Sequence, residues 1–219
     1  SLKLESLLPY FFGSFLLSVV HAIIPNHWLP LIALGRSEKW SVKETLGITA
    51  ITGMAHTFST ILLGILVGLI GFKLTHEFEE ITHIVAPSVL VLLGLFYLVK
   101  DLLSKKHHHH DHFHVDKIEP TKRKNKKALI ASLSFAMFFS PCIEIEAYYL
   151  QASAQGWAGI LLVSINYFVV TVGGMVLLVF LGQKGLEKMN WHFLEHHEKL
   201  LTGIVLILVG IFAFFGHHE

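Results

Sequence analysis

Six side chains able to bind metal or protons lie inside long apolar stretches of the chain. They are His21, His27, His56, Cys142, Glu144 and Glu146. A charged group at the centre of a bilayer costs roughly 2.5 to 3.5 kcal/mol on insertion scales, so such groups normally face a partner or a cavity. Imidazole, thiolate and carboxylate ligands suit Zn²⁺, Ni²⁺ or Co²⁺ better than Mg²⁺ or Ca²⁺, which prefer oxygen shells. The residue types predict a site for a divalent transition metal.

The first pair of histidines flanks a proline. On an unbroken helix, side chains six residues apart are rotated by about 240°, so His21 and His27 would point away from each other. Pro25 removes a backbone donor and disfavours helical geometry at the residue before it. With the helix interrupted there, both imidazoles can reach one ion, and the Asn26 side chain can join them.

A second proline precedes the cysteine, in the segment Ser140–Pro141–Cys142. If the helix resumes after Pro141, Cys142 and Glu146 share a face, and if the segment stays extended, Cys142, Glu144 and Glu146 project together. Either geometry places a thiol beside a carboxylate. Three other readings stay open: Cys142 as a small buried hydrophobe, the two glutamates as a proton path, and His56 as a donor between helices.

The composition indicates that membrane-spanning elements position these residues. The chain has 219 residues, of which 53% are hydrophobic and 15% charged, with a mean hydropathy of +0.60. Soluble domains carry about 25% charged residues, so this chain belongs in a membrane. A net charge of +1 and a single cysteine exclude a nucleic-acid-binding domain and a disulfide scaffold.

Apolar stretches predict an all-α membrane protein with six transmembrane helices, at roughly 7–34, 45–72, 84–104, 128–150, 156–182 and 199–216. Fifteen of the seventeen lysines and arginines follow the first, third and fifth stretches. The positive-inside rule then places both termini outside the cytoplasm. Matching Ser, Pro and Gly patterns predict two inverted three-helix repeats, 1–104 and 128–219, with the first and fourth helices broken.

The connection over 105–127 is rich in histidine and lysine and is predicted to be cytoplasmic. Its chelating residues are His107, His108, His109, His110, Asp111, His112 and His114. Such a tract binds ions loosely and raises their concentration at the membrane face. On the other side, His76, Glu77, Glu80 and His83 form a candidate outer mouth, or else a solvated helix end.

The motif around His21-Ala-Ile-Ile-Pro-Asn-His27, followed by Gly53-Met-Ala-His56, a His-rich connection and Ser140-Pro-Cys142, resembles the bacterial nickel/cobalt efflux permeases of the NicO (RcnA-like) type, within the lysine-exporter superfamily. The resemblance implies a polytopic exporter of transition-metal ions in a bacterial inner membrane. Asn26 and Ile143 depart from that family's usual Gly and Pro, which leaves the choice of metal open.

We therefore expect a divalent-metal transporter that exports Ni, Co or Zn ions against protons and has no resident cofactor beyond the transported ion. Import by the same fold and assembly as a homo-oligomer are compatible with the sequence. A transmembrane thiol-redox carrier needs two thiols, and only Cys142 is present. A metalloenzyme is less favoured, because the His192-x-x-Glu195-His196 pattern stands without the further ligands such enzymes need.

Overall fold

The structure is a computed structural model that describes residues 2–77, 81–104, 125–185 and 192–215. Every regular element in this part of the chain is helical, which confirms the predicted all-α class. The helices are α1 (Leu2–Ile23), α2 (Leu29–Ser37), α3 (Val42–Glu77), α4 (Ala86–Ser104), α5 (Lys126–Phe138), α6 (Ile143–Ala152), α7 (Gly156–Gln183) and α8 (His192–Phe215), with a π-helical turn η1 (Ile81–Val85) before α4 and a 3₁₀ turn η3 (Ser153–Gln155) before α7.

Five helical stretches within the described residues are long and apolar enough to cross a membrane. They are Glu5–Ile23, Val42–Leu74, His83–Leu103, Ile143–Gln183 and His196–Phe215. Large apolar side chains such as Leu66, Phe96 and Phe212 are exposed on their outer faces. A water-facing surface would not carry this pattern, whereas lipid solvates it. The chain is a multi-pass membrane protein.

The predicted fourth span, 128–150, is divided between two short helices. Helix α5 has 13 residues and α6 has 10, both fewer than the roughly 20 needed to cross the hydrocarbon core. Helix α6 shares the apolar range Ile143–Gln183 with α7, and the chain reverses between them at Gly156, whose φ of 58° suits glycine. The structure thus shows five candidate spans, and six separate spans stay a prediction.

Pro25 and Pro141 interrupt their helices as the sequence predicts. Helix α1 ends at Ile23, before Pro25, and α2 begins only at Leu29. Likewise α5 ends at Phe138, before Pro141, and the chain is helical again from Ile143. In each case the pyrrolidine ring cannot donate to the preceding turn and restricts its predecessor, so the chain needs a few non-helical residues there.

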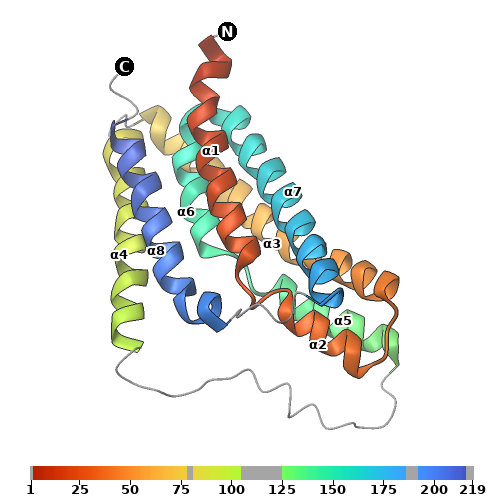
Figure 1. Cartoon of the computed structure of the whole chain (residues 1–219). Helices are drawn as coiled ribbons and strands as arrows, with labels where there is room; N and C mark the ends of the chain where they lie inside the picture. Colours follow the sequence, from red (N-terminus) through yellow and green to blue (C-terminus); the bar gives the residue numbers. More distant parts are fainter. Residues whose placement is uncertain (1, 78–80, 105–124, 186–191, 216–219) are drawn as a thin grey trace.

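The helices pack in pairs around two buried clusters, one centred on Tyr149 and Tyr167 and the other on Trp28 and Ile32. Helix α4 packs along α8, α3 along α7, α1 along α7, and α5 with α6 along α3. Figure 1 shows that α1, α4 and α7 run in one direction and α3, α6 and α8 in the other, so α1 begins and α8 ends at the same end of the bundle.

Two glycines allow α4 and α8 to touch backbone to backbone. A Cβ built on Gly203 would lie 2.8 Å from the Gly94 carbonyl oxygen, and one built on Gly94 would lie 2.7 Å from the Gly203 carbonyl oxygen. Backbone atoms cannot rotate away as side chains do. The close α4–α8 contact therefore depends on both glycines.

Replacing Gly203 by alanine should separate α4 from α8 and lower the free energy of unfolding by about 1 to 3 kcal/mol, the usual cost of overpacking. Thermal unfolding of the purified protein in detergent measures the change. Gly173→Ala is the matched control, because a Cβ at Gly173 meets nothing within 4 Å. Equal stability of the two variants would contradict the close contact.

Candidate metal centre

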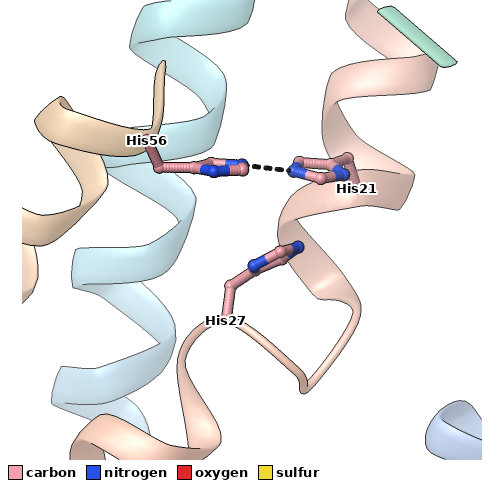
Figure 2. Close-up of side chains that lie close together, drawn as sticks. All are labelled: His21, His27 and His56. Carbon is pink, nitrogen blue, oxygen red and sulfur yellow. Dashed lines mark hydrogen bonds between the residues drawn. The ribbon is translucent and has the colours of Figure 1, made fainter. Parts of the chain in front are cut away.

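Three histidines from separate segments converge in the interior of the bundle. His21 lies in the last turn of α1, His27 in the break before α2, and His56 within α3. Their ring centroids are 4.6 Å apart for His21 and His27, 4.9 Å for His27 and His56, and 5.4 Å for His21 and His56. Figure 2 shows the three rings facing a common space, with Nε2 of His21 lying 3.1 Å from Nε2 of His56. One ligand atom from each residue lies within 4.8 Å of the others.

A second donor group shares His21 and adds the segment after Pro141. The Cys142 thiol lies 3.5 Å from Nδ1 of His21 and donates to the Glu144 carboxylate at 2.9 Å. One ligand atom from each of these residues again lies within 4.8 Å of the others. Cys142 is extended, with φ −88° and ψ 106°, and its amide donates to the Thr60 hydroxyl at 3.2 Å. That bond ties the start of α6 to α3.

The separations between donors fit a tetrahedral transition-metal ion. Metal–nitrogen bonds of about 2.05 Å and metal–sulfur bonds of about 2.3 Å put two nitrogens about 3.3 Å apart and a nitrogen and a sulfur about 3.5 Å apart. The observed distances are 3.1 Å between Nε2 of His21 and Nε2 of His56, and 3.5 Å between Nδ1 of His21 and Sγ of Cys142. One pair in each group is thus already spaced for a shared ion, and the remaining ligand atoms lie within 4.8 Å of one another.

The surroundings of His56 fix which of its nitrogens can bind metal. The side chain is 1% exposed, and its Nδ1 lies 3.3 Å from the Met137 carbonyl oxygen. A carbonyl can only accept, so Nδ1 carries the ring hydrogen and Nε2 keeps its lone pair. The Tyr167 hydroxyl lies 3.3 Å from Nε2 on the same side as His21. This is the outer-shell arrangement that orients metal-binding imidazoles in proteins.

A cavity of about 190 Å³ gives access to both donor groups. His21, His27, Cys142 and Glu144 contribute to its lining, together with Tyr97 of α4 and three residues of α8, Glu198, Lys199 and Thr202. The Asn26 side chain also lines it and donates a hydrogen bond to the Glu198 carboxylate. This hydrogen bond links the break between α1 and α2 to α8, and a metal contact of the Asn26 side chain stays a prediction.

Other predicted site residues lie elsewhere. The Glu146 carboxylate is buried without a hydrogen-bond partner among the described residues, and it is in neither donor group. Because α6 is helical from Ile143, Glu144 and Glu146 point in different directions. At the candidate outer mouth, His76, Glu77 and His83 are exposed and in neither group. Glu80 and the tract His107, His108, His109, His110, Asp111, His112 and His114 lie outside the described residues.

The sequence reasoning missed three polar residues. Glu198 lines the cavity, Tyr167 contacts His56, and Asp101 is 2% exposed within α4. Asp101 carried a signal, since a carboxylate inside the predicted third span is costly without a partner. Glu198 lies at the end of a His-rich run, and only the packing of α8 beside α1 shows that it faces the donors.

In comparisons with known proteins, no family model, curated protein or solved structure matches the chain. What the centre can do chemically therefore follows from its own residues.

Substituting His21 by alanine should weaken the tightest class of Zn²⁺ binding by about tenfold or more, because it removes a donor from both groups, and losing even an outer-shell partner of a metal ligand costs about that much. Competition with a fluorescent chelator on purified protein measures this affinity. His76→Ala is the control, since that exposed histidine lies in neither donor group. Unchanged Zn²⁺ binding in His21→Ala would rule out both donor groups as metal sites.

Proposed function

We propose that the protein transports divalent transition-metal ions across the bacterial cytoplasmic membrane, exporting Ni²⁺, Co²⁺ or Zn²⁺ in exchange for protons. The observation that carries the proposal is the convergence of three imidazoles, a thiol and a carboxylate inside a bundle of apolar helices. Such groups are expensive in a membrane, and they mark ion pathways where they occur together.

Transport explains the placement of the donors better than a structural metal site does. Structural sites are closed and hold four ligands rigidly, whereas these donors line a cavity. All of them except His56 also stand at two interrupted helices, α1–α2 and α5–α6. Interrupted helices in matching positions surround the substrate site of many secondary transporters, because the non-helical segments can move and their free polar groups can meet an ion.

The proposal includes two inverted repeats, with α1–α2, α3 and α4 corresponding to α5–α6, α7 and α8. Their packing supports it, because α3 pairs with α7 and α4 with α8, while α1 lies on α7 as α5 and α6 lie on α3. Rocking of one repeat against the other would expose the donors to each side in turn.

The proposed direction rests on charge and on the His-rich connection. Among the described residues, most lysines and arginines lie in α2, at the starts of α3 and α5 and near the ends of α4 and α7. These segments are at the end of the bundle opposite the start of α1 (Figure 1), and the positive-inside rule assigns that end to the cytoplasm. Histidines in 105–127 would then concentrate ions on that side. The resemblance to nickel/cobalt efflux permeases agrees with export.

In liposomes carrying the purified protein and a pH gradient, Ni²⁺, Co²⁺ or Zn²⁺ should move opposite to protons, and His21→Ala should slow this flux by about tenfold or more because it removes a donor from both groups. A metal-sensitive dye inside the vesicles reports the flux, and His76→Ala serves as the control. Metal moving in the same direction as protons would favour an importer. Wild-type flux in His21→Ala would contradict transport through this centre.

A further inference from the structure

His21 belongs to both donor groups, and it contributes a different nitrogen to each. Its Nε2 faces Nε2 of His56 at 3.1 Å, and its Nδ1 faces Sγ of Cys142 at 3.5 Å. The two nitrogens lie on different edges of the imidazole ring. The ring therefore stands between the two groups rather than in the middle of one common shell.

A neutral imidazole has one lone pair and one N–H, so it can bind an ion through only one of its nitrogens. An ion between His21, His27 and His56 requires the lone pair on Nε2, which leaves the hydrogen on Nδ1. An ion between His21, Cys142 and Glu144 requires the lone pair on Nδ1, which leaves the hydrogen on Nε2. The two arrangements exclude each other while His21 is neutral.

We propose that the centre contains two adjacent and mutually exclusive cation positions that share His21. The histidine position comprises His21, His27 and His56, and the mixed position comprises His21, Cys142 and Glu144. This inference rests on the proposed transport function and describes how the ion is held within that site. The ion passes from one position to the other as His21 exchanges the nitrogen that binds it.

The two positions are built by different parts of the chain. The histidine position uses α1, the break after it and α3, whereas the mixed position joins α1 to the start of α6. The Cys142 amide, which donates to Thr60, and the Met137 carbonyl, which accepts from His56, connect the second broken helix to α3. A movement of α5 and α6 against α3 would therefore change the relative affinity of the two positions.

Cobalt spectroscopy separates the two positions. A thiolate bound to Co²⁺ gives a charge-transfer band in the near ultraviolet, and Cys142 is the only cysteine in the chain. The band therefore reports the mixed position alone, whatever Co²⁺ the histidines of 105–127 bind. Full-length protein in detergent is titrated with Co²⁺ to saturation, and the band is measured per chain.

His56→Ala should increase the band by about twofold, because an ion that divides evenly between two positions is confined to the mixed one when the histidine position is weakened. His76→Ala should leave the band unchanged. A band that stays constant or falls in His56→Ala would show a single shared shell and overturn the proposal. So would the absence of a band from every variant.

Cys142→Ser provides an independent test with a small change of volume. It should abolish the band, yet retain Co²⁺ in the histidine position with an affinity within about tenfold of wild type, since all three imidazoles remain. A loss of more than about a hundredfold would mean that the thiol belongs to one undivided site. The cobalt spectra do not depend on ion flux. They can therefore contradict the two-position proposal while liposomes still show transport, or support it while liposomes show none.

Discussion

The structure depends on how the backbone groups freed at two helix breaks are satisfied inside an apolar bundle. In a bilayer, water cannot reach such groups, so each needs a partner from the protein. The Ile23 carbonyl accepts from the indole of Trp28 at 3.2 Å, and the Met137 carbonyl accepts from the His56 ring. The Cys142 amide donates to Thr60. Two of these three bonds also orient or anchor the metal donors.

Hydrogen bonds at the helix breaks thus also position the metal donors. His56 donates through Nδ1 to the Met137 carbonyl near the end of α5, which also accepts from the Ser140 amide at 3.3 Å, and this leaves its Nε2 to face His21. Thr60, one turn further along α3, holds the start of α6 so that the Cys142 thiol faces the same ring. Without the prolines there would be no free backbone groups to satisfy, and without those bonds the imidazole of His56 and the thiol would lack a fixed direction.

Helix α3 can support this arrangement because its buried polar residues are largely satisfied within the helix. The hydroxyls of Thr49, Thr52 and Thr57 donate to carbonyls one turn earlier in α3, at 2.8, 2.9 and 2.9 Å. Such bonds let threonine lie in an apolar interior without water. The helix therefore presents a polar face to the centre at little cost in desolvation.

Much of this arrangement could be predicted from the sequence, because it follows from residue types and local geometry. Prolines at 25 and 141 predict the breaks, and histidine, cysteine and glutamate beside them predict the donors. The sequence could not divide those donors into two groups around His21, since ring orientation is set by packing. Nor could the sequence predict the hydrogen bond from Asn26 to Glu198, because only the approach of α8 to the break between α1 and α2 brings these residues together.

The division of the predicted fourth span into two short helices also depends on packing and local geometry. Hydropathy treats 128–150 as one apolar stretch, yet the Ser140–Pro141 break leaves two short helices, α5 and α6, that pack on α3 instead of forming one straight rod. Nor could periodicity exclude Glu146 from the donors, because that depends on whether the chain after Cys142 is extended or helical.

The most direct measurement is an experimental structure of the protein loaded with Zn²⁺ or Co²⁺, with anomalous scattering recorded at the metal edge. We expect an anomalous peak within bonding distance of His21 and of either His27 and His56 or Cys142 and Glu144. A protein that holds metal elsewhere, with no peak beside His21, would contradict it.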